Sequence, residues 1–261
     1  MTARDGCRPP PDFPLAVGHR PGHISPFMST LDATQEAAPW RAGLHAARQL
    51  VGPGLVLQAL AVGLVLAYYF VPAAQPMFAQ LSAWRNDGGF AFSALASALC
   101  GGLLPFLYLR ALPGTRAANP WPHLLFFVAF WAWKGAEVDL QYRTWAMVFG
   151  RVPSFATVAP KVLCDQFLYN PLWAAPTANL CFAWKDAGFR WAPVLADVRR
   201  GRWFARSVLP VLIPTWAVWI PVVCCVYSLP SALQVPLFNV ALCFWSLLYV
   251  HVVSRQVEMP R

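Results

Sequence analysis

Charged residues are scarce in this chain. Only 12% of its 261 residues are Asp, Glu, Lys or Arg, about half of the roughly 25% that is typical of soluble domains. Hydrophobic residues make up 58%, and several uncharged runs approach 20 residues, which is about the length that crosses a hydrocarbon layer of roughly 30 Å. The shortage of charge therefore argues against an ordinary soluble domain and predicts a protein that crosses a membrane several times.

Familiar catalytic motifs are also missing. The sequence holds no GxxxxGK loop, GxGxxG turn, HExxH helix or GxSxG elbow, and its seven cysteines form no CxxC pair. These patterns mark nucleotide, zinc and nucleophile sites. We therefore expect no enzyme, no cofactor and no metal site. An intramembrane enzyme is the last-ranked alternative, because Glu137, Asp139 and Asp165 are candidate acids without a recognisable nucleophile.

Basic residues outnumber acidic ones by 20 to 11, which gives a net charge of +9. In a soluble chain this excess would suggest nucleic-acid binding. Here it lies mainly between the apolar runs, where the positive-inside rule places it in membrane proteins. We expect the lipid bilayer as partner and no nucleic acid.

The chain divides into three parts. Residues 1–48 are rich in proline and too polar to bury a core, which predicts a disordered arm. Residues 49–255 form a single transmembrane helical domain, and residues 256–261 are a short tail. Met28 competes with Met1 as the natural start.

The expected fold is all-α, a polytopic transmembrane bundle of about six spans with helices kinked by prolines. Small residues recur every fourth position in the first two spans, including Gly63 and Gly102, so these two helices could pack closely on each other. The spans are expected at residues 50–71, 90–109, 122–150, 162–184, 208–227 and 233–253.

The third span is unusual because charges follow its apolar start. Lys134, Glu137 and Gln141 share one helix face, and Asp139 and Arg143 lie nearly opposite. Two opposed polar faces cannot both avoid lipid. The helix therefore either leaves the hydrocarbon after roughly residue 137 or is surrounded by other helices.

The segment KVLCDQFLYNPLW begins at Lys161 and places Asp165 and Gln166 inside an apolar helix, with Asn170 one turn later. An intramembrane carboxylate is costly and marks a functional site by default. The alternative is structural, because Lys161 lies one turn away and could neutralise Asp165. The residues predicted to line or gate a polar path are Lys134, Glu137, Asp139, Asp165, Gln166 and Asn170.

An arginine-rich loop follows the fourth span, with Arg199, Arg200, Arg202 and Arg206. These side chains could bind anionic lipid headgroups, although a topology determinant without a specific ligand is favoured. Six spans place this loop and both termini on one side, which the positive-inside rule identifies as cytoplasmic, whereas five spans would separate them.

The Lys, Asp-Gln and Pro pattern of KVLCDQFLYNPLW resembles the signature of the family of Mpv-type mitochondrial and twenty-two-kilodalton peroxisomal membrane proteins. The resemblance covers about residues 90–253. It implies a membrane-embedded helical protein, often proposed to pass small solutes, without a soluble catalytic domain. Further residues that fit the family's motifs are Gly102, Tyr108, Leu112, Trp216, Trp219, Pro221, Pro230, Trp245, Ser246 and Tyr249.

The leading hypothesis is a channel- or transporter-like protein for small solutes. The runner-up is a non-transporting scaffold, in which the same charges neutralise one another and the small residues mediate assembly, for example into a homo-oligomer. The 17 Arg against 3 Lys favour a GC-rich bacterial genome and hence a bacterial inner membrane. By the resemblance alone, a mitochondrial inner or peroxisomal membrane is the alternative.

Overall fold

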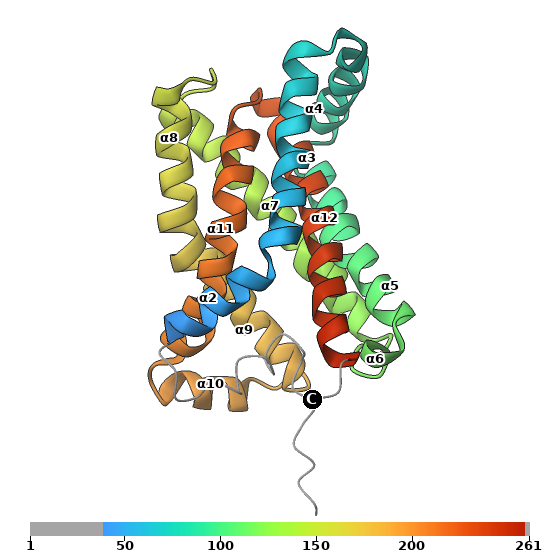
Figure 1. Ribbon diagram of the computed structural model, residues 1–261, viewed down its shortest axis with the longest axis vertical. Coiled ribbons are helices and arrows are strands. Elements are labelled where there is room, and N and C mark those ends of the chain that lie inside the picture. Colours follow the sequence, from blue (N-terminus) through green and yellow to red (C-terminus); the bar gives the residue numbers. More distant parts are fainter. Residues whose placement is uncertain (1–38, 259–261) are drawn as a thin grey trace, which may run out of the picture.

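The computed structural model describes residues 39–258, which form a bundle of helices without any strand (Figure 1). The all-α prediction is confirmed for this part of the chain. Residues 1–38 of the predicted arm and residues 259–261 lie outside the described residues.

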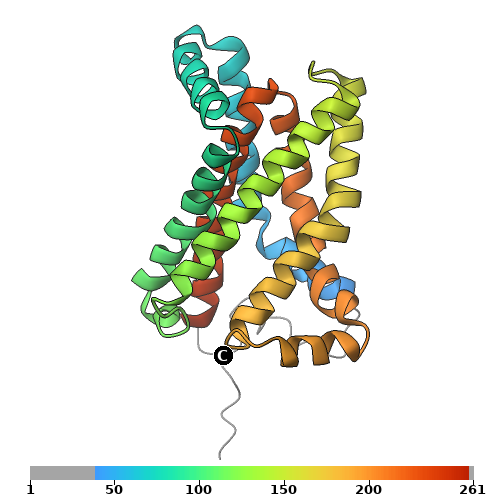
Figure 2. The same ribbon diagram turned by 180° about the vertical axis from the view of Figure 1, so that it is seen from behind.

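The chain runs back and forth along the length of the bundle (Figures 1 and 2). Short helices lie at the lower end in Figure 1, and they are α2 (Pro39–Gln49), α6 (Pro113–Arg116) and α10 (Trp191–Arg199). The successive passes are α3 (Val51–Phe70); η1 (Pro72–Ala74) with α4 (Gln75–Ser97), η2 (Ala98–Leu103) and α5 (Leu104–Ala111); α7 (His123–Phe149); α8 (Phe155–Cys164) with η3 (Asp165–Ala174) and α9 (Ala175–Asp186); η4 (Phe204–Val208) with α11 (Leu209–Tyr227); and α12 (Ser231–Glu258).

Four stretches within the described residues are long and apolar enough to cross a membrane, at Val51–Phe70, Pro72–Ala111, Phe204–Tyr227 and Ser231–Leu248. The passes through α7 and through α8, η3 and α9 contain the intramembrane charges singled out above. The protein is therefore a membrane protein in which the polar passes lie beside the apolar ones.

The outer surface of the bundle is apolar. Many large hydrophobic side chains have no neighbour covering them, as expected where lipid is the solvent. Leu125 and Met147 on α7 are 76% and 70% exposed, and Leu95 on α4 is 71% exposed. Others on the outer faces are Leu55, Val56, Leu66, Leu163, Phe167, Leu168, Leu172 and Trp173.

The predicted boundary of the N-terminal arm is wrong. Residues 39–48, assigned to a disordered arm, belong to α2, which packs against α11. A side chain at Gly43 would lie 2.7 Å from Cδ1 of Ile213, so the two helices are in close contact there. The prediction failed because the prolines lie upstream, whereas PWRAGLHAARQ is rich in good helix formers. Helix α12 also runs to Glu258, three residues into the predicted tail.

The closest helix approach involves α7 and α4 rather than the first two spans. A Cβ at Gly135 would overlap the carbonyl oxygen of Ser93 and lie 2.6 Å from Cβ of Ser97, and one at Gly102 would lie 2.8 Å from the carbonyl oxygen of Phe127. Gly63 on α3, in contrast, faces open space. The expected pairing of the two small-residue stripes is therefore not formed, because the second stripe packs against α7.

Helix η3 has the wide turns of a π-helix and begins at Asp165. Pro171 lies inside it, and proline has no amide hydrogen to donate to the preceding turn. Wide turns of this kind are frequent at functional sites. The irregular turns expected from proline in this span therefore lie beside its polar residues Asp165, Gln166 and Asn170.

Candidate functional site

Helix α7 presents polar side chains on two faces. It is continuous over 27 residues, a length of about 40 Å at roughly 1.5 Å per residue. Lys134 and Gln141 are buried on one face, and Asp139 is buried on the other. Neither alternative drawn from the sequence holds in full: α7 continues past residue 137, and neighbouring helices cover its two polar faces, while the side that carries Leu125 and Met147 stays exposed.

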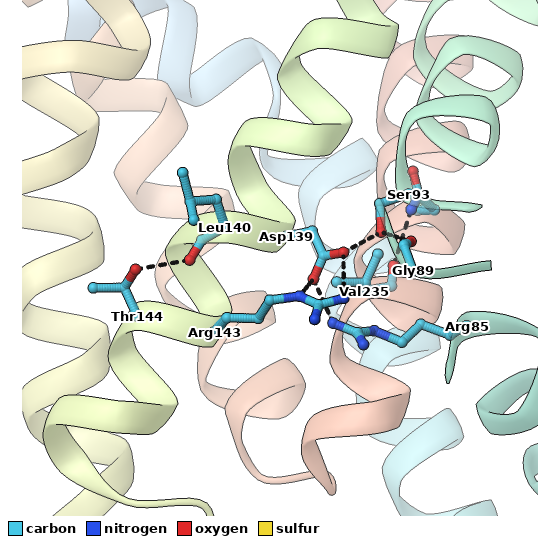
Figure 3. A network of polar contacts seen from close by, with 9 residues as sticks. Arg85, Gly89, Ser93, Asp139, Leu140, Arg143, Thr144 and Val235 are labelled. Carbon is cyan, nitrogen blue, oxygen red and sulfur yellow. Dashed lines mark hydrogen bonds and ion pairs between the residues drawn. The ribbon is translucent and has the colours of Figure 1, made fainter. Parts of the chain in front are cut away.

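One face forms a closed ionic cluster with α4 (Figure 3). Asp139, which is 0% exposed, accepts hydrogen bonds from Arg85, from Ser93 Oγ at 2.8 Å and from Arg143 at 2.9 and 3.2 Å. The guanidinium of Arg143 also lies 4.5 Å from the ring centroid of Phe90. Two cations and one anion leave this cluster with a charge of +1. Both carboxylate oxygens of Asp139 are bonded.

The opposite face of α7 carries a second cluster, directed toward η3 and α9. Nζ of Lys134 donates to Glu137 Oε1 at 2.6 Å and to Thr177 Oγ1 at 3.2 Å. The hydroxyl of Tyr169 donates to the same Glu137 oxygen. Lys134 and Glu137 are thus in contact with each other and with a neighbouring pass, as expected for intramembrane charges that cannot face lipid unpaired.

Asp165 and Lys161 have different partners. Asp165 is 6% exposed and accepts a hydrogen bond of 3.1 Å from the hydroxyl of Tyr227 on α11. Nζ of Lys161 donates to the carbonyl oxygen of Gly150 at 2.6 Å. No ion pair within 4.0 Å joins these two described side chains. The predicted structural pair is therefore not formed, because the ammonium reaches back across the α7–α8 turn.

A cavity of about 780 Å³ lies inside the bundle, bounded by α7, η3, α9, α11 and α12. Its volume falls in the range of roughly 300 to 1,000 Å³ that is usual for small-molecule sites. Four of the six residues predicted to line a polar path do line it, namely Lys134, Asp165, Gln166 and Asn170.

The other two predicted path residues have different places. Glu137 is not among the residues around the cavity but holds Lys134, which is. Asp139 is on the far face of α7, in the cluster with Arg85. The structure therefore separates the predicted set into a cavity group, a supporting carboxylate and a distinct buried cluster.

Aromatic side chains form part of the cavity wall. Tyr142, Tyr169, Trp219 and Phe238 all line it. The ring of Phe238 lies 6.1 Å from that of Tyr142 and 5.7 Å from that of Trp219, centroid to centroid. The cavity wall therefore combines a buried carboxylate with several aromatic rings.

The lower end of the cavity is more polar. Lys185 and Asp186 form an ion pair there, and His123 lies on the same wall. Asn179 Nδ2 donates to the carbonyl oxygen of Ser207 at 3.1 Å. Polar groups thus occur along the cavity from α9 to η3.

The arginine-rich loop lies at this lower end, with α10 (Figure 1). Arg199, Arg200 and Arg202 are exposed, and Nη2 of Arg206 donates to Asp197 Oδ1 at 2.9 Å. α2 lies at the same end, so the described part of the N-terminal segment and the loop are on one side of the bundle. Whether these side chains bind lipid headgroups stays a prediction.

Sequence reasoning missed several residues that define the site. Tyr169 and Tyr142 lie in the motifs that were singled out, but tyrosine gives no signal of intramembrane charge. Tyr227 belongs to a different pass and meets Asp165 only through the fold. Arg85 carried the one available signal, since it is a single arginine close to an apolar run.

Within residues 39–258 no group of three His, Cys, Asp or Glu side chains could hold a metal ion. The available protein-family models, curated proteins and solved structures include no match to this chain. The interpretation of the site therefore rests on the chemistry of the cavity and its surrounding helices.

Proposed function

We propose that the protein is channel- or transporter-like and that its central cavity holds and passes small solutes across the membrane. The observation that supports this most is the cavity itself, which lies between passes within the bundle and is lined by Lys134, Asp165, Gln166 and Asn170. Buried polar and charged groups in a membrane commonly mark a solute or ion path, because burying them away from water costs free energy.

The family resemblance forms part of the same proposal. Of the Lys161, Asp165 and Pro171 pattern that carries it, Asp165 lines the cavity, and Pro171 follows in the same π-helix, η3. We propose a distant member of the Mpv-type and peroxisomal membrane protein family, in a bacterial inner membrane.

Reconstitution tests the proposal directly. The purified protein in liposomes should release a trapped set of small solutes faster than empty liposomes do. Ala178 lines the cavity, so Ala178→Phe should slow release by filling it. Ala129, exposed on α7, offers the matched control, since Ala129→Phe adds the same ring to the lipid-facing surface.

Two outcomes contradict the proposal. Absence of release by folded protein at any solute size would exclude passage. Equal release by Ala178→Phe and by the unaltered protein, at equal amounts of folded protein, would exclude this cavity as the path.

A scaffold is the second candidate. It is supported by the closed Asp139 cluster, which neutralises its own carboxylate, and by Gly63 of α3, which faces open space where a second copy could pack. Small residues on a lipid-facing helix favour close helix association. Cross-linking in membranes that traps a dimer through α3, together with no solute release, would favour this alternative.

The basic residues support an orientation with the lower end of Figure 1 in the cytoplasm. That end holds the arginines of α2, α6 and α10, whereas the α7–α8 connection holds Arg151. In a background without native cysteines, His45→Cys and Ala196→Cys should resist an impermeant maleimide added outside intact cells. Ala156→Cys, at the start of α8, should react. Labelling of only one of the first two would contradict the shared side.

A further inference from the structure

The charges around the cavity do not cancel. Among the lining residues, Lys134 is paired with Glu137, and Lys185 is paired with Asp186. Asp165 also lines the cavity, but no ion pair within 4.0 Å reaches it among the described residues. Its neighbours are neutral: the phenol of Tyr227 donates a hydrogen bond to the carboxylate, and the amide of Gln141 lies beside it. A carboxylate at this depth is costly without a counter-ion.

The nearest candidate counter-ion is engaged elsewhere. The ammonium of Lys161 is bonded to the carbonyl oxygen of Gly150 and lies 5.9 Å from the ring centroid of Tyr227. Lys161 is not one of the residues around the cavity. A cation that enters the cavity would therefore meet a carboxylate that the protein leaves without a charge partner.

Other acceptors of the lining point the same way. Buried acceptor atoms of lining residues without a donor are Gln166 Oε1, Asn179 Oδ1 and Asp186 Oδ2. Against these three stand the amide Nε2 of Gln141, which lies beside the Asp165 carboxylate, and Nδ1 of His123, which donates or accepts according to the tautomer. The lining offers more acceptors than donors, which suits a solute that brings N–H or O–H groups.

Aromatic rings of the lining complete the site. Tyr142, Tyr169, Trp219 and Phe238 line the same cavity, and a desolvated cation is attracted to the face of such a ring. A hard inorganic cation such as Mg²⁺ or Ca²⁺ would instead take a shell of about six or more oxygen ligands. Rings beside one carboxylate fit a cation with a carbon surface.

From this geometry we infer that the cavity binds a small organic cation, a protonated or quaternary amine, with its charged nitrogen at Asp165 and its carbon groups against the rings. This inference rests on the proposed function for the passage of the solute, but not for its binding. The two can therefore fail separately.

Binding is tested on the full chain in a maltoside detergent by calorimetry, with choline and its uncharged isostere 3,3-dimethylbutan-1-ol as probes. Choline should bind, and the isostere should bind at least about tenfold more weakly. Asp165→Asn should remove that preference, whereas Asp165→Glu should keep it. Asp87→Asn is the matched control, since it removes an exposed carboxylate on α4 away from the cavity.

A second variant guards against a folding defect at position 165. Trp219→Leu removes one ring from the wall and should weaken choline binding while leaving the isostere unchanged. Equal affinity for choline and the isostere, or choline binding that survives Asp165→Asn, would overturn the inference. Full displacement of choline by sodium chloride, with no displacement by equal concentrations of a bulky organic salt, would assign the site to inorganic cations and also overturn it.

Release from liposomes separates this inference from the proposed function. Choline should leave faster than uncharged erythritol and anionic lactate, and Asp165→Asn should abolish the difference. If all three leave equally fast, passage stands and the cation preference is wrong. If none leaves but choline still binds through Asp165, the cation site stands and the proposed passage is wrong.

Discussion

The two polar faces of α7 bury carboxylates in opposite ways. On the α4 side, Asp139 has donors for both oxygens, from two guanidinium groups and a hydroxyl, and is not among the residues around the cavity. On the η3 side, Asp165 faces a cavity of about 780 Å³ and has a phenol as its bonded partner. Both residues are nearly inaccessible to solvent, so burial alone does not distinguish a structural charge from a functional one. The number of hydrogen-bond partners and the presence of an adjoining cavity distinguish the two.

The largest expected effect comes from removing the two carboxylate charges separately. Asp139→Asn leaves Arg85 buried without a counter-ion, and breaking a buried pair in this way costs about 3 to 5 kcal/mol. Asp165→Asn keeps an acceptor for Tyr227 and strands no cation bonded to it, so it should cost less than about 1 kcal/mol. Thermal unfolding in detergent and the yield of monodisperse protein measure the difference.

Equal destabilisation by the two asparagine variants would contradict the distinction between the faces. Ser93→Ala provides a graded check on the α4 side, because it removes one of several donors to Asp139. Its cost should be about 1 kcal/mol, between those of the two asparagine variants.

The next effect concerns the close packing of α4 against α7. In Gly135→Ala the new methyl group would overlap the backbone of Ser93, so α4 and α7 must separate, at a cost of roughly 1 to 3 kcal/mol. Gly63→Ala is the control, since no atom lies within 4 Å of its Cβ position. It should be neutral or stabilising by up to about 1 kcal/mol. A tolerated Gly135→Ala in the same unfolding assay would show that the interface adapts.

The smallest expected quantity is a coupling energy, that between Lys134 and Glu137 on the cavity side of α7. Reversing either charge alone places like charges side by side, while reversing both restores the pair. The double variant should therefore be milder than either single one, with a coupling of about 0.5 to 3 kcal/mol. Additive losses in thermal stability would mean that the 2.6 Å contact contributes little.

Sequence periodicity was informative where contacts are local. Lys134 and Glu137 are three positions apart, so a helix brings them together, and their pairing follows from the pattern. The apolar runs likewise predict the membrane helices, because length and lack of charge are properties of each segment alone.

Contacts between distant segments could not be read in this way. Arg85 meets Asp139 across 54 positions, and Tyr227 meets Asp165 across 62. Lys161 shows the opposite error. Its spacing of four residues predicted an ion pair with Asp165, but its ammonium donates to the backbone carbonyl of Gly150 in the connection before α8. Residue spacing within one helix indicates candidate partners, and the packing of helices from distant parts of the chain determines which of them pair.

The bond from Lys161 to Gly150 has a mechanical consequence. It ties α8 to the residue that directly follows α7, across the short connection between them. Sliding of α8 along α7 would have to break this bond, so we expect the two helices to move together as one rigid unit. Any rearrangement that opens the cavity would then bend the chain after α8, in the wide turns of η3 around Pro171, where the backbone already lacks one amide donor.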